Sequence, residues 1–247
     1  MIITTESIVL LTRKFGDTSK ILTAFTRDHG KVSLLAKGAF SPKSKFGSSL
    51  ETLSRNTITF YKKAGRDLQT LSNSELRVSM NRMYGSSDHI IVGMLIAESL
   101  NKALEEYHPH PELYDYFSEI LNNLNLILPN PVNLFTASQV FLANDLGFGL
   151  DFQAHDEILL VNNEKNIYFS LSDGNILEKS AFDNNLFRFD ADVFHILKQI
   201  SESNIENLSN IYIDERMQTQ INSFFIRYFS YHLDRKFNYR TLELMKV

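Results

Sequence analysis

The sequence predicts an α+β fold, with a five-stranded β-barrel over residues 1–80 and a mainly α-helical domain over residues 81–247. Three observations support this prediction. Up to about Leu76 the chain consists of short β-rich segments with turns roughly every ten residues. Beyond about residue 80 the apolar residues recur with the period of a helix. The segment at about 151–180 returns to short strands, which indicates an inserted β-hairpin.

The barrel strands are predicted at residues 7–13, 19–26, 31–36, 57–61 and 68–71. The sequence Asp28-His29-Gly30 forms a tight turn, in which Gly30 supplies a positive φ. Residues 64–67 turn the fourth strand into the fifth. Five short strands that close on themselves are typical of the OB fold, since closure removes the exposed sheet edges.

The helices are predicted at residues 89–107, 111–128, 132–146, 191–200 and 214–237. Ile90, Met94, Ala97, Leu100 and Leu104 form one core-facing stripe on the first of them. Between the third and fourth helices, strands at 157–161 and 166–171 are joined by a polar turn at 162–165. The sequence has no internal repeat and no low-complexity linker.

The composition is that of an ordinary soluble globular protein of 247 residues, with 43% hydrophobic and 22% charged residues. It contains no cysteine, which excludes disulfides, a thiolate nucleophile and a cysteine-ligated zinc site. No signal peptide and no apolar run of about 20 residues is present. We therefore expect a cytoplasmic protein without a membrane segment.

The charge is distributed very unevenly along the chain. Residues 1–82 carry 14 Lys and Arg against 6 Asp and Glu, a net charge of +8, whereas the remainder carries −12. The overall net charge of −4 hides this difference. A basic module attracts a polyanion, because every phosphate that it neutralises releases condensed counterions.

No sequence signature of an enzyme is present. The chain lacks a P-loop, an H-E-x-x-H motif and a G-x-S-x-G motif. Asp190 and Asp192 precede a helix, where carboxylates favour the helix dipole, so we do not interpret them as metal ligands. His108 and His110 lie in a proline-bounded loop without the further ligands that zinc needs. We expect neither an enzyme nor a bound cofactor or metal.

The segment 37–47 has the pattern of a nucleic-acid-binding loop. Its lysines alternate with Phe40 and Phe46, so that ammonium groups can meet phosphates while rings stack on bases. Alternatively, the two rings anchor the loop on the barrel and the lysines are merely solvated. Lys62, Lys63 and Arg66 form a second cluster. The residues predicted to contact nucleic acid are Arg13, Lys14, Lys20, Arg27, Lys31, Lys37, Phe40, Lys43, Lys45, Phe46, Lys62, Lys63 and Arg66.

Over its first 80 residues the chain resembles the bacterial RecO family. The resemblance lies in the segments 8–10 (IVL), 15–22 (FGDTSKIL), 25–31 (FTRDHGK), 36–39 (AKGA) with Ser44, and 66–71 (RDLQTL). The segment Leu146-Gly147-Phe148 falls where a helix of the family ends.

This resemblance implies a non-enzymatic recombination mediator in DNA repair, located in the bacterial cytoplasm at the nucleoid. Members of the family bind single- and double-stranded DNA without sequence preference and anneal complementary strands. They act with RecR and the single-strand-binding protein to load the RecA recombinase. Many relatives carry a four-cysteine zinc module, whereas residues 151–180 of this chain contain none. We expect apolar packing of residues 158–161 and 167–169 to replace the metal.

The resemblance also implies a docking site for the acidic, Phe-terminated tail of the single-strand-binding protein. Such a tail needs an apolar pocket with a rim of cations. The last helix offers aromatic and basic residues for this role: Phe224, Arg227, Tyr228, Arg235 and Arg240. Alternatively, its aromatic stripe belongs to the core.

Two other functions are compatible with the sequence. An OB-fold RNA-binding or ribosome-associated factor would have the same electrostatics, and competition between single-stranded DNA and RNA would distinguish it. A scaffold could instead bind an acidic protein through its barrel. Salt-sensitive DNA binding that is lost when Lys37, Lys43 and Lys45 become Glu would argue against the scaffold.

Overall fold

The computed structural model describes residues 1–152, 166–177 and 185–246. The chain divides into two compact units, which we describe separately. The first contains Met1–Ile127 and Thr241–Val247, and the second contains Leu128–Arg240. In these described ranges no helix is both long and apolar enough to cross a membrane.

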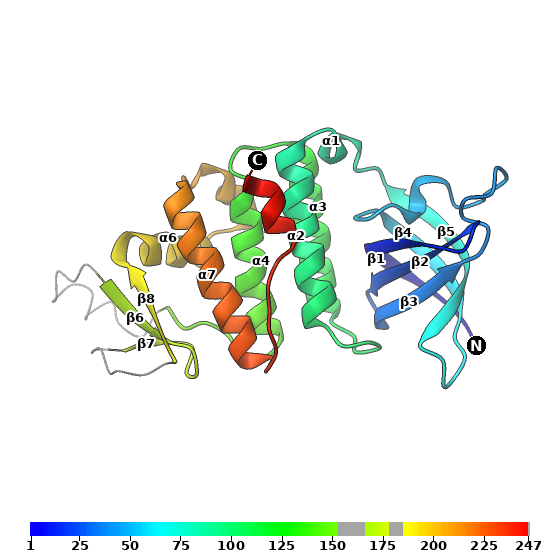
Figure 1. The fold of residues 1–247 in the computed structure, drawn as a ribbon. Helices are drawn as coiled ribbons and strands as arrows, with labels where there is room; N and C mark the ends of the chain where they lie inside the picture. The colour runs from blue at the N-terminus through cyan, green and yellow to red at the C-terminus, as the bar shows by residue number, and fades with distance from the viewer. Residues whose placement is uncertain (153–165, 178–184, 247) are drawn as a thin grey trace. The chain divides into compact units, whose positions relative to one another are not determined.

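The first unit begins with the expected five-stranded closed barrel (Figure 1). Its strands are β1 (Ile2–Phe15), β2 (Ser19–Thr26), β3 (Gly30–Ala36), β4 (Arg55–Tyr61) and β5 (Leu68–Val78). They close in the order β1-β2-β3-β5-β4, with β3 and β5 parallel and the other pairs antiparallel. This order confirms the prediction of an OB-type barrel.

β1 is longer than the sequence pattern predicts, because two different partners share it. Its first half, Ile2 to Ile8, pairs with β4, and its second half, Ser7 to Phe15, pairs with β2. A bulge between Val9 and Leu11 marks the change. Such a bulge bends a strand, which allows β1 to belong to both walls of the barrel.

The barrel core is formed by alternate residues of each strand. In β3, for example, Val32, Leu34 and Ala36 are buried and their neighbours are partly exposed. The short 3-10 helix η1 (Gly47–Leu50) adds Leu50 to the same core. Gly30 begins β3 at φ +67°, and a Cβ there would lie 2.1 Å from the carbonyl oxygen of His108. Both the turn and this close approach therefore require glycine.

Three helices and a C-terminal 3-10 segment complete the first unit: α1 (Asn81–Tyr84), α2 (Ser87–Ala103), α3 (Pro111–Leu126) and η3 (Thr241–Lys246). α2 contacts β1, α1, α3 and η3, so it is buried over more of its surface than the single predicted stripe. It ends four residues earlier than predicted, at Ala103. Beyond it, Glu106 forms a bridge with Lys31, and the Tyr107 N–H donates to the Lys31 carbonyl at 3.0 Å.

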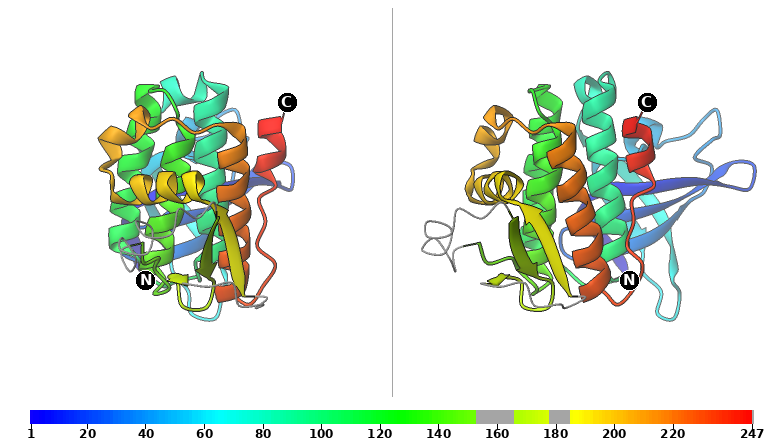
Figure 2. Two further views of the ribbon diagram at one scale, coloured as in Figure 1. Left: turned by 90° about the vertical axis from the view of Figure 1, so that its left-hand side faces the viewer. Right: turned by 60° about the vertical axis from the view of Figure 1, so that its left-hand side comes forward.

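The second unit combines helices α4 (Val132–Asp145), α6 (Ala191–Glu202) and α7 (Glu215–His232) and the 3-10 helix η2 (Ile205–Asn210) with a small sheet. The sheet has the order β7-β6-β8, from Ile176–Leu177, Asn166–Ser170 and Leu186–Asp190. Figure 2 shows this unit from two further sides. The predicted strand at 157–161 and its turn at 162–165 lie outside the described residues. Within them, β6 pairs with β7 and β8 instead.

A side chain caps the start of α7, whereas Asp190 at the start of α6 makes no side-chain cap hydrogen bond. Asp214 accepts a hydrogen bond from the Met217 N–H at 2.7 Å and caps α7. α7 ends at His232 rather than at residue 237, because Asp234 has φ +46° and the chain turns back there. Asp190 and Asp192 lie at the start of α6 and bind Arg216 of α7, which ties the two helices together.

Candidate nucleic-acid interface

The structure divides the predicted DNA-binding cations of the barrel into three groups. The first group faces the helices of the first unit and contains Arg27 and Lys31. The second surrounds the β1–β2 hairpin and the loop after β3, and contains Arg13, Lys14, Lys20, Lys37, Lys43 and Lys45. The third lies on the β4–β5 turn and contains Lys62, Lys63 and Arg66.

Arg27 and Lys31 hold the barrel against its own helices. Arg27 donates to both carboxylate oxygens of Asp115 in α3, at 2.9 and 2.8 Å. This hydrogen-bonded pair raises the pKa of Arg27 and lowers that of Asp115. The Lys31 ammonium donates to the carbonyl of Asn101 at 2.6 Å, near the end of α2. Both cations have partners within the protein, so we leave them out of the interface.

The second group lies around the β1–β2 hairpin and the loop after β3, with Arg13 on one face of the hairpin and Lys14 and Lys20 on the other. The backbone N–H of Phe40 donates to the carbonyl of Thr18 at 2.9 Å, which places the loop beside the tip of the hairpin. We call this region the hairpin–loop surface. It consists of Arg13, Lys14, Lys20, Lys37, Phe40, Lys43 and Lys45.

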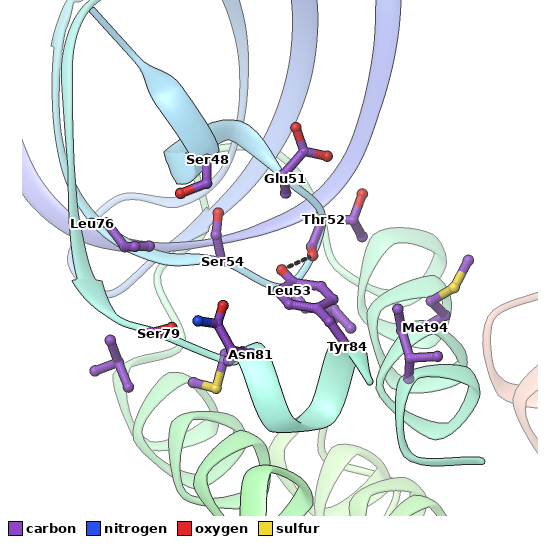
Figure 3. Close-up of a pocket in the computed structure, with 13 residues that line it drawn as sticks. Ser48, Glu51, Thr52, Leu53, Ser54, Leu76, Ser79, Asn81, Tyr84 and Met94 are labelled. Carbon is purple, nitrogen blue, oxygen red and sulfur yellow. Dashed lines mark hydrogen bonds between the residues drawn. The ribbon is translucent and has the colours of Figure 1, made fainter. Parts of the chain in front are cut away.

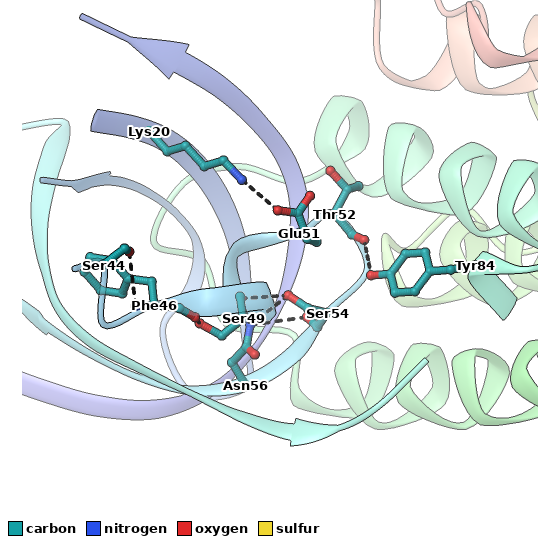
Figure 4. A network of polar contacts seen from close by, with 9 residues as sticks. All are labelled: Lys20, Ser44, Phe46, Ser49, Glu51, Thr52, Ser54, Asn56 and Tyr84. Atoms are coloured by element: carbon teal, nitrogen blue, oxygen red, sulfur yellow. Dashed lines mark hydrogen bonds and ion pairs between the residues drawn. The ribbon is translucent and has the colours of Figure 1, made fainter. Parts of the chain in front are cut away.

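The loop is held by polar contacts behind this surface (Figure 4). The Ser44 hydroxyl accepts from the Phe46 N–H at 3.3 Å, and the Ser49 hydroxyl donates to the Phe46 carbonyl at 2.6 Å. The Asn56 amide donates to the Ser49 carbonyl at 2.6 Å. The loop is thus fixed to β4, and its basic residues project from a defined backbone.

The two phenylalanines of this loop have different environments. Phe46 is only 5% exposed and packs in the barrel core, so it anchors the loop and its ring is not available to a base. The predicted stacking role therefore does not fit Phe46. Phe40 is 47% exposed, with the Lys20 ammonium 5.3 Å from its ring centre. Only Phe40 retains the geometry of a stacking residue.

The cations of the hairpin–loop surface are mostly uncompensated. Lys14 lies directly across from Lys20 in the β1–β2 register, an unfavourable arrangement of like charges. Glu51 relieves it, with Lys20 Nζ 2.9 Å from Glu51 Oε1. Within the described part of the chain, five cations of this surface form no ion pair: Arg13, Lys14, Lys37, Lys43 and Lys45. Their charges are available to a polyanion.

The sequence analysis missed two exposed apolar residues on the same hairpin. Phe15 is 51% exposed, and Leu11, four residues earlier in the same strand, is also exposed. A strand predicted to end at residue 13 does not include Phe15. The signal that could have found it is the alternation that continues through Leu11, Arg13 and Phe15, which places the three on one face of the hairpin.

The third group lies on a turn whose backbone is held by a residue of β5. The side chain of Gln69 accepts from the Lys63 N–H at 2.8 Å and donates to the carbonyls of Lys63 and Arg66 at 3.1 and 2.5 Å. The Lys62 ammonium lies 4.8 Å from the ring centre of Tyr107. The turn is at the opposite end of the barrel from the loop after β3, as Figures 1 and 2 show.

A cavity of about 460 Å³ in the first unit was not anticipated from the sequence (Figure 3). Apolar side chains dominate its lining, among them Leu53, Leu76 and Met94. The Tyr84 hydroxyl donates to the Thr52 carbonyl at 2.7 Å, and burial raises the pKa of Tyr84 to about 12. No local motif marks the cavity, because its walls come from η1 and the loop after it, from β5 and from the helices α1 and α2.

The aromatic residues proposed for a tail-binding pocket lie in the core of the second unit. Phe224 and Tyr228 are both fully buried, and the Tyr228 hydroxyl donates to the Phe148 carbonyl at 2.9 Å. They pack against Phe169 and cannot form the floor of an open pocket. Arg227 lies over the ring of Phe187 at 5.5 Å, while Arg235 and Arg240 are on the surface.

No metal site is present among the residues that the structure describes. No three of their His, Asp or Glu side chains are grouped so as to hold an ion. The His108 and His110 rings lie 5.0 Å apart without a third ligand. Of the segment expected to replace a zinc module, residues 153–165 and 178–180 lie outside the described ranges.

Known proteins resemble the chain along its whole length. Residues 1–80 match the family description "Recombination protein O N terminal", and residues 86–241 match "Recombination protein O C terminal". A DNA repair protein RecO from Chloroherpeton thalassium is 28% identical over 99% of this chain and 98% of its own. One from Salinibacter ruber is 37% identical over 59% of this chain and 56% of its own. One from Bacillus subtilis is 24% identical over 87% and 84%, respectively.

Proposed function

Because this chain belongs to the RecO family of DNA repair and recombination proteins, we propose that its hairpin–loop surface binds single- and double-stranded DNA without sequence preference. Bound strands are then annealed to their complements. The observation that supports this proposal best is that five cations of the β1–β2 hairpin and the loop after β3 form no ion pair within the described residues. The same loop carries the exposed ring of Phe40 and is anchored by Phe46.

The chemistry of this surface suits a nucleic-acid backbone. Ammonium and guanidinium groups contact phosphates, and Phe40 offers a face on which any base can stack. Neither contact reads the edge of a base, which accounts for the absence of sequence preference. Five phosphate contacts at about 0.7 each predict a log–log salt slope of about −3.5 for single strands.

The proposal extends to protein partners. The chain acts with RecR and the single-strand-binding protein to load RecA, and it breaks no covalent bond of its substrate. Arg227, Arg235 and Arg240 remain candidates for contacts to the acidic tail of the single-strand-binding protein, since cations recognise acidic motifs. The apolar end of that tail then needs a pocket other than Phe224 and Tyr228, which the core already occupies.

The test is a fluorescence-anisotropy titration of a labelled 30-mer single strand across a salt series, with annealing of its complement followed in parallel. The Lys37→Glu/Lys43→Glu variant should bind at least about 10-fold more weakly and lose about two contacts from the salt slope. A matched control is Arg188→Glu/Lys236→Glu, which changes the same number of charges on exposed residues of the second unit. It should bind like the wild type.

Three results would contradict the proposal. If DNA binding were absent or independent of salt, the basic barrel would instead bind an acidic protein partner, as in a scaffold. Equal weakening by the control variant would show that only the total charge matters. Displacement of bound DNA by equal lengths of RNA at much lower concentration would favour an RNA-binding factor.

A further inference from the structure

The β4–β5 turn carries a second combination of an exposed ring and cations. Tyr61, the last residue of β4, is 44% exposed and lies across from Ile2, which is also exposed. Lys63 and Arg66 follow it on the turn and are exposed. We call Tyr61, Lys62, Lys63 and Arg66 the turn surface.

This turn is preorganised. Its backbone is fixed by the buried side chain of Gln69, which makes three hydrogen bonds across it. The ring of Tyr107 positions Lys62. Lys63 and Arg66 form no ion pair within the described ranges, and Asp67 is the acidic residue of the turn itself. A net positive charge therefore lies on a rigid support beside an aromatic ring.

The two surfaces are too far apart to act as one electrostatic site. Ile2 of β1 lies beside the turn surface, and Phe15 lies in the hairpin 13 residues further along the strand, which is roughly 40 Å at about 3.3 Å per residue. The two surfaces are closer along β3 and β5, where Ser33 pairs with Leu68. There Lys37 and Arg66 are about six residues of strand apart, roughly 20 Å, which still exceeds the screening length of about 10 Å at 0.1 M salt. Figures 1 and 2 show the turn and the loop at opposite ends of the barrel.

The wall formed by β1, β4 and β5 does not favour a single strand that runs across it from one surface to the other. Glu6 lies across from Thr57, and Thr57 lies across from Glu75, so that two carboxylates occur in one row across β1, β4 and β5. Arg77 offsets one of these charges at 3.8 Å from Glu6. A phosphate chain that crossed this row would meet a net negative charge.

We propose that the turn surface is a second single-strand binding site, so that one molecule holds two strands at the same time. Tyr61 stacks on a base while Lys63 and Arg66 contact its phosphates. This inference rests on the proposed function of the hairpin–loop surface and adds to it the means by which one barrel brings two strands together.

The test counts strands per molecule with oligo-dT, which cannot anneal to itself. Native mass spectrometry with dT of about 12 nucleotides, within the site size of an OB fold, should show two strands bound to one wild-type chain. Fluorescence transfer between donor- and acceptor-labelled dT should appear at the same protein concentration.

The Lys63→Glu/Arg66→Glu variant should bind one strand per chain and lose about 90% of the fluorescence transfer, with first-strand affinity within about threefold of wild type. Tyr61→Ala keeps every charge and should also weaken the second binding event. Arg188→Glu/Lys236→Glu is the matched control and should keep two strands.

One strand per wild-type chain, or two strands retained by both turn variants, would overturn this inference and leave the proposed function intact. Failure of the wild-type protein to bind any strand would instead contradict the proposed function itself.

Discussion

Arg27 and Asp115 form a two-pronged ion pair, with Arg27 Nε 2.9 Å from Asp115 Oδ1 and Nη2 2.8 Å from Oδ2. The first residue follows β2 and the second lies in α3, so the pair joins the barrel to its helices. The planar guanidinium matches the carboxylate in both hydrogen bonds, a geometry that lysine cannot reproduce. Arg27 thus stabilises the fold, and we predict that it does not contact DNA.

Removal of the Arg27 side chain should therefore lower the stability of the protein without weakening DNA binding. We expect Arg27→Ala to lower the melting temperature while single-strand affinity stays within about twofold, because one fewer distant charge matters little at physiological salt. Lys37→Glu should do the opposite. Thermal melts and anisotropy titrations of the two variants provide the measurement. If the Arg27→Ala protein were well folded but bound DNA much more weakly, Arg27 would belong to the DNA interface after all.

The same pair predicts a pH dependence. The hydrogen bond from Arg27 lowers the pKa of Asp115, so its contribution to stability is present above the ordinary carboxyl pKa and is lost as the pH falls through the lowered value. The difference in melting temperature between wild type and Asp115→Asn should be constant from pH 8 to 5 and should shrink below about pH 4. A difference that grows on acidification would contradict this assignment.

Phe40 and Phe46 should respond in opposite ways to truncation. Phe46→Ala empties a position in the barrel core and should cost about 3–5 kcal/mol of unfolding free energy. Phe40→Ala removes an exposed ring and should leave stability nearly unchanged, while it weakens single-strand binding by about 1–3 kcal/mol. Denaturant titrations and anisotropy measure the two effects. Unchanged affinity of Phe40→Ala would remove stacking from the proposed mechanism.

Residues such as these show how far the sequence could predict the site. Alternation and glycine turns placed all five strands, because these signals are local. Arg27 and Lys37 look equivalent in sequence, and only the packing of α3 against the barrel distinguishes them. Likewise, α2 ends at Ala103, and beyond it Glu106 pairs with Lys31, a long-range contact that no local pattern records. Strand periodicity thus predicted the barrel but not which of its faces the helices cover.

Gly30 and Gly16 differ in why they must be glycine. Gly16 has only a strained backbone conformation, whereas Gly30 also lies too close to another segment of backbone for a Cβ to fit. Both have positive φ, at +67° and +60°. A Cβ on Gly30 would lie 2.1 Å from the carbonyl oxygen of His108, whereas a Cβ on Gly16 would have no neighbouring atom within 4 Å. Gly16→Ala should cost about 1–2 kcal/mol, the penalty for a left-handed alanine. Gly30→Ala should cost clearly more, since backbone must move. If the two variants had similar unfolding free energies, the backbone around His108 would have to move aside at little energetic cost.

Glu51 should limit DNA binding, since it neutralises Lys20 within the hairpin–loop surface. In the Glu51→Gln variant the side chain keeps its shape but loses its charge, so Lys20 and the opposing Lys14 are both left for phosphate. We expect tighter single-strand binding and a salt slope steeper by about 0.7, the value for one added contact.

Glu75→Gln is a suitable control for that measurement, because it removes one exposed carboxylate from β5, away from the hairpin. A purely global effect of charge would give both variants the same gain in affinity. A larger gain for Glu51→Gln, together with the steeper slope, would show that Lys20 contacts the strand directly. If Glu51→Gln bound more weakly than wild type, the ion pair with Lys20 would instead be needed to hold the loop in its binding conformation.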